Sequence, residues 1–267
     1  MPGMTQIASQ QHDVATPRGR LFAQSWTPAD ASGAPLVLLH DSLGCVALWR
    51  DFPERLARAT GRQVIAYDRL GFGRSDAHPG ALPASFIQDE ARGDYSSVCQ
   101  HFGLTEFVAM GHSVGGGMAV ACAAQHPHAC RGLITESAQA FVEDRTLDGI
   151  RVAQRQFEGA GQMDRLKKYH GDKADWVLRA WTETWLSEAF RSWSLDQPLR
   201  EVRCPVLSLH GDRDEYGSVR QPERIVALVP GPVTLGVLAN CGHVPHRECL
   251  DEVLAAITAF LSPPGAG

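Results

Sequence analysis

The stretch that most constrains this chain is residues 107–119, FVAMGHSVGGGMA, in which an apolar run ends at a serine and small residues follow. The apolar run predicts a buried strand, and the residues after it have the composition and spacing of a helix. Ser113 lies at the junction, with Gly111 and Gly115 two residues to either side. So tight a turn strains the serine backbone and leaves no room for side chains at the glycine positions. The hydroxyl then stands at a helix N-terminus, where developing negative charge is favoured.

A Gly-x-Ser-x-Gly motif by itself also fits a glycine-rich turn whose serine caps the following helix. The strand before Ser113 and the helix after it favour the alternative, a serine held out as a nucleophile. A serine hydroxyl reacts poorly at neutral pH unless a base, usually a histidine oriented by a carboxylate, accepts its proton. The rest of the chain must therefore supply both groups.

The composition is that of a globular protein with a sizeable core, because 44% of the 267 residues are hydrophobic. A net charge of −5 without a basic run argues against a nucleic-acid partner. The 7 cysteines include no C-x-x-C pair, which favours a reducing, cytoplasmic compartment. The polar N-terminus does not resemble a signal peptide, and no apolar run is long enough for a membrane span, so we expect no membrane partner.

Short apolar runs alternate with helical patterns along most of the chain. Buried strands are predicted at residues 36–40, 64–67, 106–110, 132–135, 206–210 and 233–238, and a hairpin at residues 12–26 after a disordered lead over residues 1–11. Helices are predicted near residues 48–60, 86–102, 114–126, 219–228 and 248–261. This alternation predicts an α/β fold whose parallel sheet is covered on both faces and binds ligands beyond the carboxyl ends of its strands. Residues 139–199 interrupt it with a helical composition that contains no strand candidate.

Two late histidines are candidates for the base. His243 lies in the stretch NCGHVPH, residues 240–246, between the last predicted strand and the last helix. Its loop position favours it over His246, which follows Pro245 at the start of that helix and is the second candidate. We expect most of the other histidines to be surface or packing residues.

The candidate carboxylates follow the strand at residues 206–210 in the stretch HGDRDEYG. Asp212 comes directly after Gly211, where an aspartate side chain commonly caps the local turn. Asp214 lies further along the loop, closer to where a histidine from the next loop could meet it. The order along the chain is serine, aspartate, histidine in either case.

These motifs together resemble the α/β-hydrolase superfamily. The matching stretches are HDSLG at residues 40–44, YDRLGFGRS at 67–75, the serine turn, GDRD at 211–214 and CGH at 241–243. The resemblance spans nearly the whole chain and implies an eight-stranded, mostly parallel sheet with a helical lid inserted after the sixth strand. It implies a hydrolase core of residues 1–138 and 200–267 and a lid of residues 139–199.

The resemblance also implies a mechanism that passes through an acyl-serine intermediate. Ser113 attacks a carbonyl carbon, and His243 accepts its proton. Asp214, which matches the acid of family loops that read Gly-x-x-Asp, is implied as the residue that orients His243, ahead of Asp212. Haloalkane dehalogenases and epoxide hydrolases of this fold use an aspartate nucleophile, so the serine disfavours both.

The oxyanion hole implied by the resemblance consists of the backbone N–H groups of Ser42 and Val114. Family members usually have glycine at the position of Asp41, where the backbone is unusual, and aspartate tolerates such a backbone better than most residues. A carboxylate facing the oxyanion would oppose catalysis. We therefore expect the Asp41 side chain to turn toward its own loop or toward solvent.

No cofactor is implied, and we expect no metal site. His126, His128 and Cys130 have metal-like spacing but lie in a turn without a fourth ligand nearby, so a solvated turn is the better interpretation. In the predicted lid, Trp181 and Trp185 share a helical face and are candidates for the wall of a substrate pocket. Packing on the core explains most of the lid tryptophans equally well.

We expect a soluble, cofactor-free serine hydrolase that cleaves an ester or thioester of a small to medium, partly apolar acid. One alternative is a C–C bond hydrolase of the ring-cleavage type, which uses the same triad. The other is a non-catalytic member of the fold that binds a small molecule or a protein, although binding alone does not need the serine, histidine and aspartate set. The sequence leaves the oligomeric state open.

Overall fold

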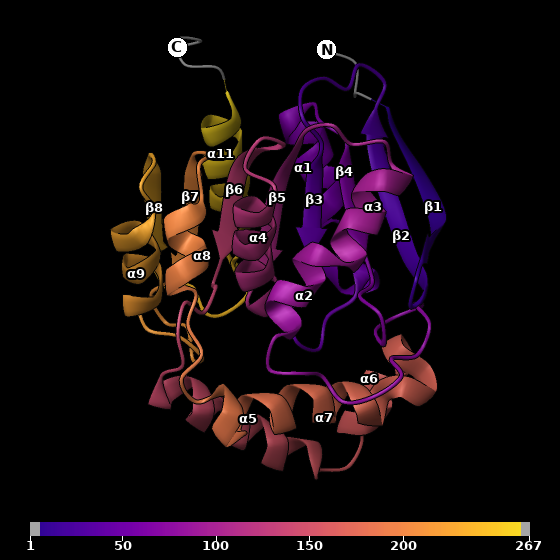
Figure 1. The fold of residues 1–267 in the computed structure, drawn as a ribbon, viewed down its shortest axis with the longest axis vertical. Helices are drawn as coiled ribbons and strands as arrows, with labels where there is room; N and C mark the ends of the chain where they lie inside the picture. The colour runs from indigo at the N-terminus through magenta and orange to yellow at the C-terminus, as the bar shows by residue number, and fades with distance from the viewer. Residues whose placement is uncertain (1–5, 263–267) are drawn as a thin grey trace.

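Eight strands form one central sheet in the computed structural model, which describes residues 6–262 (Figure 1). The strands are β1 (Ile7–Thr16), β2 (Gly19–Pro28), β3 (Leu36–Leu39), β4 (Val64–Tyr67), β5 (Phe107–His112), β6 (Cys130–Glu136), β7 (Val206–Gly211) and β8 (Val233–Leu238). Their order across the sheet is β1-β2-β4-β3-β5-β6-β7-β8. The β1–β2 and β2–β4 pairs are antiparallel and the other five pairs are parallel. The prediction of an eight-stranded, mostly parallel sheet is confirmed.

Helices cover both faces of the sheet, which explains why its inner strands read as continuous apolar runs. One face carries α1 (Phe52–Thr60) and α11 (Leu250–Leu261), which pack on each other. The opposite face carries α2 (Phe86–Arg92), α3 (Asp94–His101), α4 (Val114–Gln125), α8 (Asp196–Glu201) and α9 (Arg220–Leu228) (Figure 1). Every residue of β3, β4, β5 and β7 is buried between these layers. None of the helices within residues 6–262 is long and apolar enough to span a bilayer.

A helical segment separates β6 from β7 and lies across the carboxyl ends of the parallel strands, at the bottom of Figure 1. It contains α5 (Asp144–Phe157), α6 (Gln162–His170), η2 (Gly171–Lys173), α7 (Ala174–Trp185) and η3 (Glu188–Phe190). An antiparallel bridge joins Phe141 to Ser194, and the Leu195 N–H donates to the Ala140 carbonyl over 2.7 Å. The segment therefore leaves and rejoins the sheet at nearly one point.

Several boundaries differ from the sequence prediction, and three of them are informative. The disordered lead is wrong from Ile7 on, because β1 begins there and pairs with β2 along its whole length; residues 1–5 lie outside the described residues. Backbone pairing explains this, since a polar edge strand gives no apolar signal. The single helix predicted over residues 86–102 is two helices, which meet at Gly93. The last predicted helix begins earlier, with α10 (Pro245–Glu248), and is interrupted at Cys249.

Candidate active site

Ser113 occupies the sharp turn between β5 and α4. Its backbone has φ 56° and ψ −126°, a conformation that costs a residue with a side chain about 1–3 kcal/mol. A Cβ atom at Gly111 would lie 1.9 Å from the Gly115 carbonyl oxygen, and one at Gly115 would lie 2.1 Å from the Leu39 carbonyl oxygen. The two flanking glycines are therefore what allows β5, α4 and β3 to meet so closely around the serine.

His243 and Asp214 come together from neighbouring loops, as predicted from their positions after β8 and β7. The His243 Nδ1 atom lies 2.9 Å from Asp214 Oδ1 and 2.8 Å from Oδ2. The Tyr216 and Gly217 N–H groups also donate to Oδ1. Burial alone would raise the pKa of Asp214, but His243 and these N–H groups outweigh burial, and the pKa lies below its usual value. The carboxylate is thus ionised and fixed beside the imidazole.

Asp212 has a different partner. Its Oδ1 atom accepts a hydrogen bond from the Cys241 N–H over 3.2 Å and so ties the β7 loop to the His243 loop. His246 also lies away from the serine, because its Nδ1 atom contacts Glu136 Oε2 at 2.6 Å beneath α10. Of the alternatives that the sequence left open, the geometry brings Asp214 to His243 and leaves Asp212 and His246 in other contacts.

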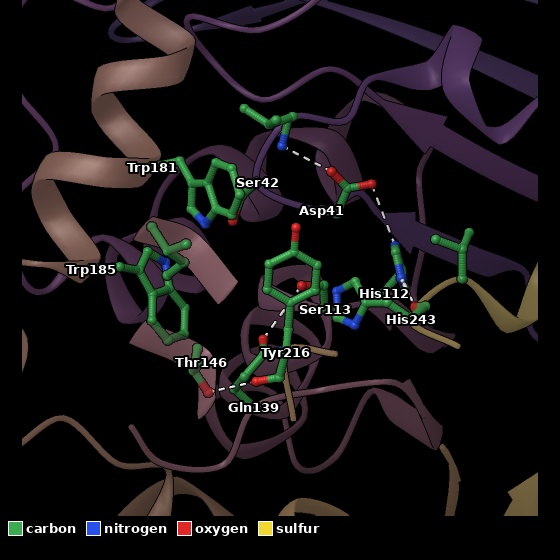
Figure 2. A pocket seen from close by; sticks show the side chains of 13 residues that line it. Asp41, Ser42, His112, Ser113, Gln139, Thr146, Trp181, Trp185, Tyr216 and His243 are labelled. Atoms are coloured by element: carbon green, nitrogen blue, oxygen red, sulfur yellow. Dashed lines mark hydrogen bonds and ion pairs between the residues drawn. The ribbon is translucent and has the colours of Figure 1, made fainter. Parts of the chain in front are cut away.

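Ser113 and His243 face the same cavity, which has a volume of about 150 Å³ (Figure 2). The Ser113 hydroxyl donates to Gln139 Oε1 over 3.4 Å, a long hydrogen bond of the kind found in substrate-free sites. Gln139 was not a predicted site residue. Its position in the loop directly after β6, at the carboxyl end of the sheet, is the only sequence signal that could have indicated it.

The walls of the cavity come from the core loops and from the inserted helices. Trp181 and Trp185 both line it, from α7 (Figure 2). The Trp181 ring lies 6.0 Å from the Tyr216 ring, whereas the Trp185 ring also packs on Phe190 at 5.0 Å. The remaining lining residues are Asp41, Ser42, Leu43, His112, Ser113, Gln139, Thr146, Ile150, Tyr216, His243 and Val244. No lysine or arginine among residues 6–262 is part of this lining, which is mainly apolar with a few polar groups near Ser113.

The loop that carries Ser42 is held by its neighbour Asp41. The Asp41 Oδ1 atom accepts from the Leu43 N–H over 2.9 Å, so the carboxylate turns back on its own loop as we expected. Its Oδ2 atom lies 3.4 Å from His112 Nδ1, a contact that the sequence did not predict. Ser42 and Val114 line one small hollow beside the main cavity, so the two loops proposed for the oxyanion hole are adjacent.

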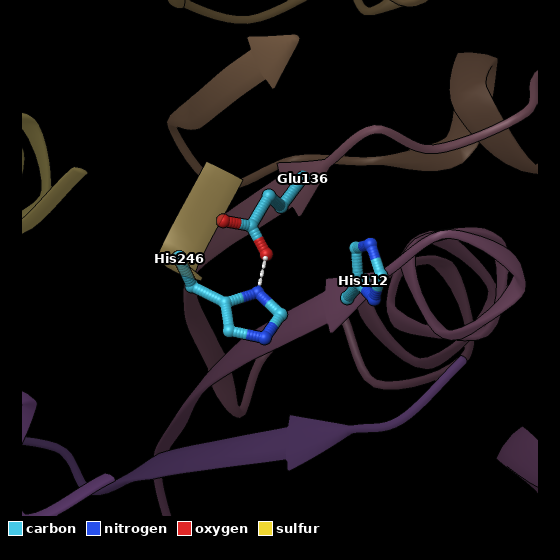
Figure 3. A group of neighbouring side chains, drawn as sticks. All are labelled: His112, Glu136 and His246. Atoms are coloured by element: carbon cyan, nitrogen blue, oxygen red, sulfur yellow. Dashed lines mark hydrogen bonds and ion pairs between the residues drawn. The ribbon is translucent and has the colours of Figure 1, made fainter. Parts of the chain in front are cut away.

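His112, Glu136 and His246 form a buried group with ligand atoms that all lie within 4.8 Å of one another (Figure 3). The His246 ring already bonds to Glu136, and His112 Nε2 donates to the His243 carbonyl oxygen over 2.7 Å. Since these hydrogen bonds engage the side chains with one another and with the backbone, we interpret the group as a hydrogen-bonded network and not as a metal site. In the stretch with metal-like spacing at residues 126–130, the His126 Nε2 atom contacts the Ala91 carbonyl oxygen.

The sequence profile of the α/β hydrolase fold family matches residues 34–248. The chain belongs to this family. It is 27% identical over 255 residues to 2-hydroxy-6-oxo-2,4-heptadienoate hydrolase from Pseudomonas putida, covering 86% of this chain and 90% of that protein. A shorter match, 32% identical over 127 residues, covers 47% of this chain and 35% of epoxide hydrolase B from Mycobacterium tuberculosis.

Among solved structures, a thermophilic esterase from Thermogutta terrifontis superimposes with a TM-score of 0.72 at 22% identity, covering 94% of this chain and 98% of that one. This likeness shows the fold. Together, the family and its curated relatives indicate that the chain is a hydrolase.

Proposed function

We propose that this hydrolase cleaves an uncharged carboxylic ester or thioester through an acyl-enzyme on Ser113. The observation that carries the proposal is the shared cavity: a serine on a strained turn and a histidine paired with a buried carboxylate open into the same small, mainly apolar space. A serine, a base and an orienting acid are the three groups that acyl transfer requires.

In the proposed mechanism the Ser113 hydroxyl attacks the substrate carbonyl while His243 Nε2 accepts its proton. The His243 Nδ1–H donates to Asp214, which keeps the ring in the required tautomer and stabilises the imidazolium that forms. Backbone N–H groups of Ser42 and Val114 stabilise the oxyanion, each being worth about 10²–10³ in rate. His243 then protonates the leaving group, and water releases the acid from the serine.

The cavity restricts the substrate by size and by charge. An apolar cavity of about 150 Å³ holds a molecule the size of benzene, so we expect a short chain or a single ring on the part of the substrate that enters it. The Asp41 carboxylate lies in the wall and no lysine or arginine of the described chain joins it. An anionic group placed there would lose its hydration, would find no lysine or arginine in the lining to pair with, and would face the Asp41 carboxylate.

We further propose that residues 139–199 act as a lid on this cavity. In support, the inserted helices lie across the strand ends, and Thr146, Ile150, Trp181 and Trp185 bring side chains to the cavity wall (Figure 1). The Thr146 hydroxyl donates to the Tyr216 carbonyl oxygen over 2.6 Å, which ties α5 to the loop of Asp214. Such a lid would exclude water and select the substrate.

A C–C bond hydrolase is the second candidate, favoured by the match to the Pseudomonas putida enzyme along nearly its whole length. The substrate named for that relative carries a carboxylate. In this chain Arg69 lines the hollow next to Ser42 and donates through Nη2 to the Asp41 carbonyl oxygen over 2.8 Å. Its buried Nε has no hydrogen-bond partner among the described residues, but Arg69 does not line the cavity that Ser113 and His243 share, so we rank ester cleavage first.

A fluorophosphonate probe and a substrate panel test this proposal. We expect wild-type protein to be labelled on Ser113 and the Ser113→Ala variant to remain unlabelled while keeping its fold by circular dichroism. Aryl esters of short acids should be hydrolysed faster than acyl-CoA thioesters or a vinylogous diketone acid. Absence of labelling would indicate a non-catalytic binding protein, and preferential cleavage of the diketone would transfer the assignment to C–C hydrolysis.

A further inference from the structure

Four groups form a continuous path beneath the cavity, visible as dashed lines in Figure 2. The His243 carbonyl oxygen accepts from His112 Nε2 over 2.7 Å, and the other ring nitrogen of His112 lies 3.4 Å from Asp41 Oδ2. The second Asp41 oxygen accepts from the Leu43 N–H over 2.9 Å. The path therefore connects the loop after β3, the end of β5 and the loop after β8, which lead to the proposed oxyanion N–H, the nucleophile and the base.

Hydrogen-bond chemistry fixes what His112 does in this path. A carbonyl oxygen can only accept, so His112 Nε2 must carry a hydrogen. Nδ1 is buried and makes no hydrogen bond within the described residues, but it lies within ion-pair distance of Asp41 Oδ2, at 3.4 Å. A protonated ring can serve both directions at once, donating to His243 and pairing with Asp41.

The charges around His112 favour that protonated ring. Burial alone would lower its pKa, but Asp41 and then Glu136 outweigh burial, and the pKa of His112 is raised above its usual value. The ionisable side chains that face it are Asp41 from the β3 loop, Glu136 from the end of β6, His246 from α10 and His243 from the β8 loop. Of the two carboxylates, Glu136 is already bonded to His246 through Oε2.

We propose that His112 and Asp41 are positioning residues, which together hold the base and the oxyanion loop in register with Ser113. The proposal rests on the serine hydrolase function proposed above and adds a requirement for catalysis outside the triad. It also gives the carboxylate at position 41 a role, where the resemblance noted from the sequence implies glycine. Glycine there has no side chain to connect the oxyanion loop to the residue that precedes the nucleophile.

Steady-state kinetics on a short aryl ester from pH 6 to pH 9 test this role with four variants. Asp41→Ala removes both contacts, so we expect kcat to fall by up to about 10²-fold, the effect of a displacement of roughly 1 Å, with KM changing by less than about threefold. Asp41→Asn keeps an acceptor for the Leu43 N–H and should recover part of kcat. His112→Gln keeps an amide donor for the His243 carbonyl and should be less impaired than His112→Ala.

The pH profile separates positioning from simple structural support. In wild type we expect kcat to decline at alkaline pH as His112 loses its Nδ1 proton, and Asp41→Asn should move that decline to lower pH. Asp51→Asn is the matched control, since Asp51 pairs with Arg55 on the surface and its loss should leave kcat and the profile unchanged. Asp41 is partly exposed, with 30% of its side chain accessible, so its variants should fold even if His112 variants do not.

Each outcome bears on the proposal. Folded Asp41→Ala protein with wild-type kcat and an unchanged alkaline limb would overturn the positioning role while leaving the serine hydrolase intact. A fall in melting temperature without a change in kcat would overturn it as well. Wild-type protein that is neither labelled by fluorophosphonate nor active on any ester would overturn the proposed function and, with it, this inference.

Discussion

Two histidine–carboxylate pairs lie close together in this protein and have very different surroundings. His243 contacts Asp214 at 2.8 Å, and His246, three residues later, contacts Glu136 at 2.6 Å, in both cases through Nδ1. The His243 side chain is 11% exposed and lines the cavity with Ser113. The His246 side chain is 3% exposed, and its ring packs 4.7 Å from that of Trp49.

The comparison shows that a short contact between imidazole and carboxylate does not identify a base. What distinguishes the two pairs is access, because only His243 shares a space with the nucleophile that could also hold a substrate. Burial lowers the pKa of His246 below its usual value despite the Glu136 carboxylate, so this ring is neutral at neutral pH and donates its Nδ1–H to Glu136. We infer that the second pair secures α10 against the sheet.

Replacing each of the two histidines by alanine gives the largest expected difference in turnover between two variants. If the proposed mechanism holds, His243→Ala should reduce turnover by roughly 10⁶-fold, as the loss of a triad histidine does in serine hydrolases. His246→Ala should keep turnover within about tenfold but destabilise the fold, since it leaves a buried carboxylate without its partner. Ester hydrolysis and denaturant unfolding, measured on both variants, check the contrast; loss of turnover in folded His246→Ala alone would reverse the assignment of the base.

The two aspartates of the β7 loop provide the next contrast. Asp214→Asn should lower kcat by up to about 10⁴-fold, because the amide holds His243 in the wrong tautomer while the fold persists. Asp212→Asn is the matched control and should cost far less rate, because Asp212 contacts the Cys241 N–H and not the imidazole. Rates measured with one ester on both folded variants decide the matter, and the opposite ranking would assign the acid to Asp212.

Changes to the wall of the cavity should act on the choice of substrate. Trp181→Ala should shift the ratio of kcat/KM between one-ring and straight-chain esters by about 10-fold or more, since one unfilled space in an apolar pocket is worth about 1–3 kcal/mol. Trp185→Ala should change selectivity and also lower thermal stability, because the Trp185 ring is buried against Phe190 and Trp193. A Trp181→Ala variant with unchanged selectivity and a lower melting temperature would show that this residue serves packing alone.

The smallest effect concerns the dependence of stability on pH. His246 is neutral in the folded protein and has its ordinary pKa of about 6.5 when unfolded, so unfolding takes up a proton below that pH. Its contribution to stability is therefore present above pH 6.5 and is lost as the pH falls. His246→Gln should make the slope of unfolding free energy between pH 7 and pH 5 shallower than in wild type; an equal slope would show that His246 does not titrate in this way.

The sequence predicted the sheet well because its inner strands are buried on both faces and leave continuous apolar runs between glycine-rich loops. It predicted edges and breaks less well. The polar strand β1 has no apolar signal, and the helical period of the apolar residues over 86–102 does not reveal the break at Gly93.

For the site, the chain order indicated which loops meet but not which side chains meet within them. Motif spacing led to Ser113, His243 and the β7 loop, whereas Gln139 and the contact between His112 and Asp41 arise from tertiary geometry. His112 is the variable residue before the serine in the Gly-x-Ser-x-Gly motif, so the motif does not specify its role. Its side chain contacts the loops of His243 and Asp41, and no pattern along the chain indicates these contacts.

The bridge between Phe141 and Ser194 has a consequence for how this protein could diverge. The inserted helices begin and end at this bridge, so the segment closes as one loop. The entropy cost of closing a loop depends only weakly on its length, and doubling the number of residues in the segment would cost only about 0.6 kcal/mol. Insertions or deletions there would not require strands to move. Descendants of this chain could therefore exchange the whole helical segment for another and acquire new substrates while inheriting the same serine.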